Sequence, residues 1–107
     1  MDILRHLAAE IPQLDPRQID DVIVGCANPE GEQGLQVGRL IAARALGQEV
    51  PGMTINRYCA SGLEAIAIAS AKINAGMGHC YVAGGAESMS LLPMTGYKLV
   101  PSYKAAM

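Results

Sequence analysis

The 107-residue chain contains no tryptophan and no phenylalanine, so its core must be built from alanine, isoleucine, leucine, valine and methionine. Charged residues are scarce too, at 17% against about 25% in ordinary globular domains. Yet 50% of the residues are hydrophobic. A chain this short buries only about two thirds of its unfolded surface, so this much apolar surface is hard to hide alone. We expect a piece of a larger protein or, failing that, a strongly associating chain.

Other absences exclude whole classes of protein. Net charge is -2 and basic residues are scattered singly, unlike the Lys/Arg face of a nucleic-acid binder. No apolar run approaches the roughly 18 residues of a membrane span, and no signal peptide precedes the first expected helix. Three widely spaced cysteines do not form a disulfide framework, which indicates a reducing compartment. We expect a cytoplasmic protein of bacterial type, or a mitochondrial or peroxisomal one in a eukaryote.

Strand and helix patterns alternate along most of the chain. The run at 21–27 is continuously apolar, as in a strand that is covered on both faces. Further strands are expected at 53–57 and 79–83, and helices at 2–10, 35–46 and 60–75, with glycine stop signals after the last two helices. This order predicts an α/β fold with a mostly parallel sheet.

The end of the chain departs from this pattern. Residues 91–107 contain two lysines and no acidic residue, and prolines and a glycine interrupt any regular element. We therefore expect residues 1–90 to form a partial α/β domain and 91–107 to open a loop excursion.

Cys59 stands where the second expected strand gives way to an Ala-rich helix. Ten of the sixteen residues at 60–75 are Ala, Leu or Ile, on every side of the helix, which is typical of burial inside a large protein. A cysteine at the first turn of such a helix faces unpaired N–H groups and the positive end of the macrodipole, which favour thiolate over thiol. Cys59 is either a small core residue or a primed nucleophile, and its place at the carboxyl end of a strand favours the nucleophile.

The remaining candidates are weaker. Cys26 and Cys80 lie within strand runs and are expected to be packing residues. They form no zinc motif with Cys59 and His79, because no C-x-x-C or H-x-x-x-H pair exists. The segment 84–87 lacks a nucleotide-binding pattern, so its two glycines are attributed to close backbone approach at a strand end.

Two motifs resemble those of one enzyme family. The stretch at 55–66, INRYCASGLEAI, resembles the active-site signature of the thiolases, the acetyl-CoA acyltransferases. The stretch at 84–90, GGAESMS, resembles the Gly-Gly-x-Glu-Ser-Met-Ser segment of the same family, and it follows the first in the family's order. The loop at 29–39 is similar to the degradative, 3-ketoacyl-CoA branch rather than to the biosynthetic branch.

The resemblance implies the front part of a thiolase fold, layered αβαβα when complete, with a buried helix that starts at Cys59. It implies that the Cys59 thiolate attacks a 3-ketoacyl-CoA and holds the acyl group as a thioester, with its backbone N–H as oxyanion donor. No metal and no bound cofactor are expected, and coenzyme A is the co-substrate. The scaffold of the site is expected to comprise Asn56, Ser61, Gly62, Gly85, Glu87 and Met89.

The family's activating histidine and second cysteine come from a carboxyl-terminal half that these 107 residues do not include. The chain alone is therefore expected to be inactive and to self-associate. In a longer protein the resemblance implies a homodimer or homotetramer, with residues 53–57 near the subunit contact. Two alternatives stay open: a condensing relative, such as a ketoacyl synthase or a lipid-transfer thiolase-like protein, and a non-catalytic dimerisation module. Residues 56–58 and 87–89 favour a thiolase.

Overall fold

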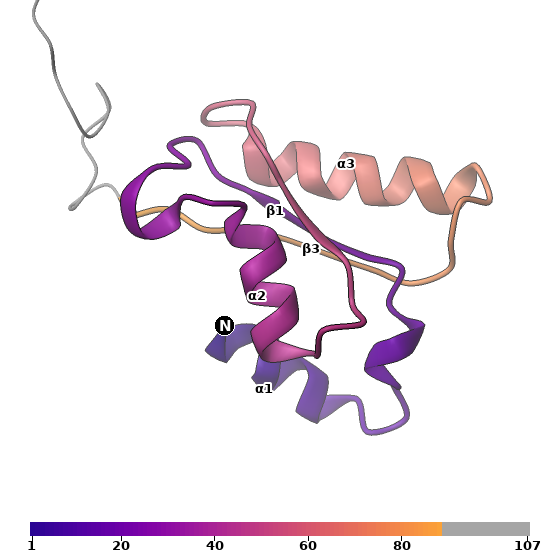
Figure 1. Ribbon diagram of the computed structural model, residues 1–107. Helices are drawn as coiled ribbons and strands as arrows, with labels where there is room; N and C mark the ends of the chain where they lie inside the picture. Colours follow the sequence, from indigo (N-terminus) through magenta and orange to yellow (C-terminus); the bar gives the residue numbers. More distant parts are fainter. Residues whose placement is uncertain (89–107) are drawn as a thin grey trace, which may run out of the picture.

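Three short strands and three helices make up residues 1–88, the part of the chain that the computed structural model describes (Figure 1). The strands form one parallel sheet, which confirms the predicted α/β class. The elements in chain order are α1 (Asp2–Glu10), a 3-10 turn (Pro16–Gln18), β1 (Asp21–Gly25), a 3-10 turn (Gly31–Gln33), α2 (Val37–Ala45), β2 (Gly52–Ile55), α3 (Ser61–Asn74) and β3 (Tyr81–Gly85).

The order of the strands fixes which face each helix covers. The sheet runs β2-β1-β3, and Val24 of β1 pairs with Thr54 on one side and with Gly84 on the other. The chain thus moves one way from β1 to β2 and the opposite way from β2 to β3. Because such crossovers are right-handed, α2 and α3 must lie on opposite faces. Figure 1 shows α3 on one side of the sheet and α1 and α2 on the other.

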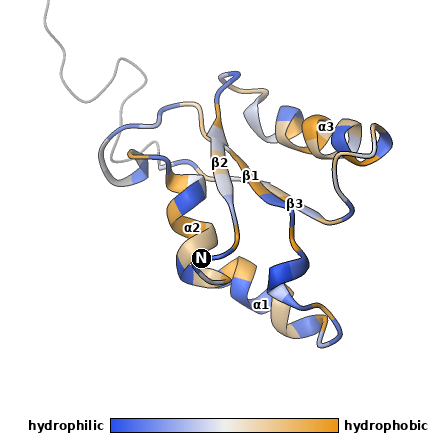
Figure 2. Cartoon of the chain, turned by 45° about the vertical axis from the view of Figure 1, so that its right-hand side comes forward, coloured by the Kyte–Doolittle hydropathy of each residue, from blue (hydrophilic) through white to orange (hydrophobic). Residues whose placement is uncertain are grey.

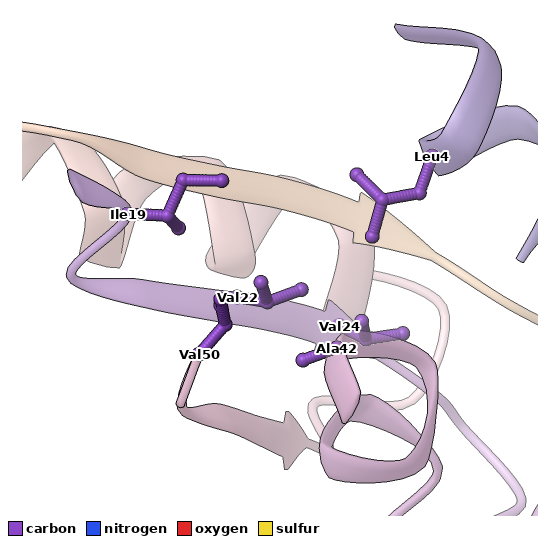
Figure 3. Packing of buried hydrophobic residues seen from close by; sticks show 6 residues of the cluster. All are labelled: Leu4, Ile19, Val22, Val24, Ala42 and Val50. Carbon is purple, nitrogen blue, oxygen red and sulfur yellow. The ribbon is translucent and has the colours of Figure 1, made fainter. Parts of the chain in front are cut away.

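One hydrophobic cluster fills the space between the sheet and α1 and α2. Side chains from both helices, from β1 and from the residues preceding β1 and β2 converge there (Figure 3). The buried members are Leu4, Ile19, Val22, Val24, Ala42 and Val50. None is aromatic, so the cluster is closed by branched aliphatic side chains and one alanine.

A second cluster lies between the sheet and α3. Ile23 of β1 is completely buried there against Ala65 and Ala69. Since successive strand residues point to opposite faces, Ile23 faces α3 while Val22 and Val24 face the first cluster. The prediction from the continuous apolar run is therefore confirmed: β1 is a central strand that is covered on both faces.

Helix α3 is buried on one face only. Ala65 and Ala69 are covered by the sheet, whereas Leu63 is 72% exposed and Ile66 is 53% exposed. Figure 2 shows apolar residues on several sides of this helix. The sheet reaches one side of α3, and no element among residues 1–88 packs against the other side. Burial of α3 on every side was expected inside a larger protein, so it stays a prediction.

Local hydrogen bonds shift several predicted boundaries. Helix α3 begins at Ser61, not at Cys59, because the residues before it form a turn. Helix α2 begins two residues later than expected, since Leu35 and Gln36 have φ of 53° and 58°. The Gln36 side chain accepts a hydrogen bond from the Thr54 N–H at 3.0 Å, which ties this left-handed turn to β2.

Strand β3 starts at Tyr81, two residues later than predicted, because the backbone before it binds a carboxylate. The N–H groups of His79 and Cys80 donate to Oδ2 of Asp20, at 2.7 Å and 3.1 Å. These bonds hold the pKa of Asp20 below its ordinary value, the His79 N–H having the largest effect. Asp20 thereby joins the start of β1 to the start of β3.

Among residues 1–88, no helix is long and apolar enough to cross a membrane. The predicted domain boundary after residue 90, the excursion at 91–107 and Met89 lie outside the described residues, so those expectations stay predictions.

Candidate functional site at the Cys59 turn

Cys59 lies in the turn that joins β2 to α3, at the carboxyl edge of the sheet. The chain leaves β1 toward α2 on one face, and it leaves the neighbouring β2 toward α3 on the other. In a sheet with the order β2-β1-β3 the strand order reverses between β1 and β3, and open α/β sheets bind their ligands outside the carboxyl ends of the strands at such a switch point. The turn that contains the predicted nucleophile lies at the same carboxyl edge of the sheet.

A cavity of about 660 Å³ opens at this point. Its walls come from all three strand ends: the residues that end and follow β1, the turn before α3 with the first helical residues, and the end of β3. The lining residues are Gly25, Ala27, Asn28, Tyr58, Cys59, Ser61, Gly62, Gly85, Ala86 and Glu87. Cys59 is solvent-exposed, so its sulfur is accessible to a molecule that enters the cavity.

The residue before Cys59 has an unfavourable backbone conformation. Tyr58 has φ of 49°, in the left-handed region, and its side chain is not buried to compensate, since the residue is 76% exposed. A bulky residue held there costs roughly 1–3 kcal/mol and persists only where its surroundings impose it. Such strain immediately before a candidate nucleophile is an indication of function.

Two side chains bind the backbone of this turn. The Ser61 hydroxyl accepts a hydrogen bond from the Arg57 N–H at 2.7 Å and donates one to the Tyr58 carbonyl at 2.6 Å. Asn56 accepts from the Tyr58 N–H at 2.8 Å. The amide of Asn56 also donates to the Ala27 carbonyl at 3.1 Å, which ties the turn to the segment after β1.

Glu87 connects the ends of β1 and β3 on the other side of the cavity. Its carboxylate accepts one hydrogen bond from the Ala27 N–H and a second one, at 3.3 Å, from the side-chain amide of Gln33. Gln33 is nearly buried and also donates to the Asn28 carbonyl at 2.6 Å. Glu87 thus lies in the cavity wall and joins the segment after β3 to two points of the connection between β1 and α2.

Close packing of β1 against α3 requires a glycine at position 25. A Cβ on Gly25 would overlap the backbone carbonyl group of Ser61 and lie 2.6 Å from the Gly62 nitrogen. The close approach that the sequence assigned to Gly84 and Gly85 is not found there: within the described residues a Cβ on Gly84 meets nothing within 4 Å, and one on Gly85 makes ordinary contacts. The tight contact is instead at Gly25, on the neighbouring strand β1.

The other two cysteines differ from Cys59 in their surroundings. Cys26 is completely buried, and burial, with a smaller effect from the Glu87 carboxylate, raises the pKa of its thiol. Cys80 is partly buried and packs on the α1 and α2 side of the sheet. Both therefore sit in packing positions, as predicted, and only Cys59 lines the cavity.

Four of the six predicted scaffold residues line the cavity with Cys59: Ser61, Gly62, Gly85 and Glu87. Asn56 lies beside it and acts through the Tyr58 backbone, and Met89 is outside the described residues. Within residues 1–88, no group of three or more His, Cys, Asp or Glu side chains is arranged to hold a metal ion.

The cavity wall formed by Gly25, Ala27 and Asn28 was not predicted from the sequence, and neither was the role of Gln33 behind it. The predicted parallel sheet could have indicated this wall, because in such a sheet the segment after β1 must meet the segment after β2 at the same edge.

The fold and the site define an α/β protein with an accessible cysteine at the switch point of a parallel sheet. Residues 2–106 match the family model described as the thiolase N-terminal domain, so the chain belongs to the thiolase family. The resemblance seen in the sequence is thereby confirmed.

Similar proteins agree with this assignment. The chain is 53% identical to the 3-ketoacyl-CoA thiolase of Bacillus subtilis strain 168 over 89 residues, which cover 82% of this chain and 23% of that protein. It is 50% identical to the 3-oxoadipyl-CoA/3-oxo-5,6-dehydrosuberyl-CoA thiolase of Escherichia coli K12 over 91 residues, 84% of this chain and 23% of that one. In these comparisons the matched segment is about a quarter of the length of each curated relative.

A solved structure shares the fold. The crystal structure of the acetyl-CoA acetyltransferase of Bacillus anthracis superimposes with a TM-score of 0.71 at 29% sequence identity, over 92% of this chain and 27% of that chain. The described elements therefore correspond to one part of a larger thiolase fold.

Proposed function

We propose that this chain supplies the nucleophile of an acyl-CoA thiolase, and that Cys59 is that nucleophile. The thiolate sulfur attacks the ketone carbon of a 3-ketoacyl-CoA, and the ketone oxygen takes the negative charge. Collapse of this adduct breaks the bond between carbons 2 and 3 and releases the enolate of acetyl-CoA, which takes up a proton. A second coenzyme A gives up its thiol proton and attacks the carbonyl carbon of the Cys59 thioester. The bond from that carbon to the Cys59 sulfur breaks, which releases the shortened acyl-CoA and restores the Cys59 thiolate.

The observation that carries the proposal is the position of Cys59. It is the one cysteine of three that is exposed and lines the cavity at the switch point. Cys26 is less suited to be the nucleophile because burial raises the pKa of its thiol. Cys80 packs on the side of the sheet that α1 and α2 cover and does not line this cavity. The backbone N–H of Cys59, just ahead of α3, is the proposed oxyanion donor.

The direction and substrate class are supported by the names of the relatives. The Bacillus subtilis and Escherichia coli proteins are thiolases of 3-ketoacyl-CoA and 3-oxoadipyl-CoA, which favours cleavage of a 3-ketoacyl-CoA with coenzyme A as co-substrate. We extend this class of substrate to the present chain. A reducing, cytosol-like location stays a prediction.

We further propose that the nucleophile acts with residues supplied from outside the 107-residue chain. A thiolate that attacks a ketone needs a base to form it and an acid to protonate the leaving enolate. Neither histidine suits this role: His6 is on α1 and pairs with Glu10, and His79 precedes β3, at the opposite end of that strand from the cavity. Assembly as a homodimer or homotetramer is part of the same proposal.

Alkylation of the three thiols tests the nucleophile directly. The chain is treated with iodoacetamide near neutral pH, and modification of each cysteine is followed by peptide mass spectrometry. We expect Cys59 to react at least roughly tenfold faster than Cys26 or Cys80, because it is exposed and next to the N-terminus of α3. A Cys59→Ala variant is the matched control and should lose the fast phase alone.

A thiolysis assay complements the alkylation. The purified chain should not cleave acetoacetyl-CoA with added coenzyme A, because the acid/base partners are supplied elsewhere. Equal alkylation rates at all three cysteines would favour an inert dimerisation module, and cleavage by the chain alone would contradict the proposed division of the active site.

A further inference from the structure

The turn before α3 contains a polar arrangement that helix formation does not explain. Ser61 is only 3% exposed, yet its hydroxyl does not cap the helix that begins with it. Both of its hydrogen bonds go backward, to the Arg57 N–H and to the Tyr58 carbonyl. The N-cap position, where a serine would bond an orphan N–H of the first turn, is occupied by Ala60. Ser61 instead binds the segment that leads into Cys59.

Asn56 binds the same segment from the other side. The two polar groups of the Tyr58 backbone are thereby both held by side chains, its N–H by Asn56 at 2.8 Å and its C=O by Ser61 at 2.6 Å. Tyr58 is the residue at φ of 49°, and Cys59 follows it directly. The Tyr58 carbonyl also accepts the Ser61 backbone N–H at 3.1 Å. Because a bulky residue does not adopt this conformation by preference, bonds from its neighbours must hold it there, and two of the three come from side chains.

We propose that Asn56 and Ser61 are positioning residues, which act through the left-handed Tyr58 to hold the Cys59 sulfur in the cavity and close to the N-terminus of α3. The proposal rests on the proposed function, since it assigns to these residues the placement of that nucleophile. Asn56 also ties the turn to the segment after β1, because its side-chain amide donates a hydrogen bond to the Ala27 carbonyl.

The test uses thiol reactivity, which does not depend on turnover. The rate constant for alkylation of Cys59 by iodoacetamide is measured in the 107-residue chain, with Cys26 and Cys80 in the same molecule as reporters of unfolding. We expect Ser61→Ala and Asn56→Ala each to slow Cys59 about fivefold, the factor that corresponds to one ordinary hydrogen bond, with the other two rates unchanged within about twofold. Ser61→Thr, which keeps the hydroxyl, should restore most of the rate.

Glycine at position 58 distinguishes positioning from general stability. Glycine adopts positive φ without strain, so in a Tyr58→Gly background the loss caused by Ser61→Ala should shrink to less than about twofold. A serine that is merely structural would give the same loss in both backgrounds. If Ser61→Ala unfolds the chain, Cys26 will react rapidly, and Asn56→Ala, at an exposed position, then decides the matter.

The two proposals can fail separately. If Cys59 is the fastest thiol in the unaltered chain and keeps its rate in both alanine variants, the positioning role is wrong while the nucleophile stands. If Cys59 is alkylated no faster than Cys80 in the unaltered chain, the assignment of Cys59 as the nucleophile is wrong, and so is the positioning role.

Discussion

One added methyl group at Gly25 would test how closely β1 must approach the turn that carries Cys59. In Gly25→Ala the new Cβ meets three backbone atoms of Ser61 and Gly62, none of which belongs to a side chain that could swing away. Overpacking of an interior costs typically about 1–3 kcal/mol, and rigid neighbours put this site at the upper end. A gain of up to about 1 kcal/mol from the stiffer unfolded chain leaves a net loss of about 2 kcal/mol.

Gly84→Ala is the matched control for this variant. Gly84 lies on the adjacent strand, where it pairs with Val24, and a Cβ there meets no described atom within 4 Å. The same chemical change should therefore be neutral or slightly stabilising, by up to about 1 kcal/mol. The comparison separates the steric effect at position 25 from the general effect of replacing a strand glycine.

Urea unfolding measures both variants at one fixed protein concentration, because association would make the midpoint depend on concentration. With a slope of about 1–2 kcal/mol per molar urea, the expected loss lowers the midpoint for Gly25→Ala by about 1–2 M. Alkylation of Cys59 should slow as well, since Gly25 contacts the first residues of α3. A midpoint equal to that of Gly84→Ala would refute the close-packing account.

Two further predictions concern pH and association. The depressed pKa of Asp20 gives stability that is present above the ordinary carboxyl pKa, near 3.8, and is lost as pH falls through the lower folded value. Asp20→Asn should therefore lower the urea midpoint at pH 6, and its deficit relative to the unaltered chain should shrink as pH falls below 3.8. Asp2→Asn is the control, and a deficit that stays constant as pH falls would contradict this. The apolar outer face of α3 should make the chain associate, so Leu63→Lys should lower the average mass seen by sedimentation velocity, whereas Ser70→Lys on an exposed position of the same helix should change it less, and a monomeric unaltered chain would contradict this.

Sequence patterns were sufficient for the fold because its main causes are local or periodic. The apolar run at β1 predicted a strand with two covered faces, and the clusters around Val22 and Ile23 are those faces. The stop signal at Gly47 and the end of α3 near Gly76 were also found, since both glycines have positive φ, at 127° and 75°. The glycine requirement at such helix ends is a property of the backbone alone.

What could not be predicted depends on contacts between residues far apart in the sequence. Asp20 delays β3 because its carboxylate binds backbone groups some 60 positions later. Gln36 is held out of α2 by a bond to β2. The exposed side of α3 agrees with the expectation that these residues are a piece of a larger protein. The composition of a helix indicates that apolar residues lie on all its sides, but it does not indicate which neighbouring elements cover each side.

The site combines both kinds of cause. The sequence around Cys59 supplies a helix start and two short polar side chains, which are local features. The strand order β2-β1-β3 then brings the segment after β1 across from that turn, so the Ala27 carbonyl can receive the Asn56 amide. A different strand order would leave the same local turn without its opposite wall. The position of Cys59 at the cavity is therefore a property of the sheet topology as much as of the motif. Mutations at Gly25 or Glu87 should disturb Cys59 even though neither is near it in sequence.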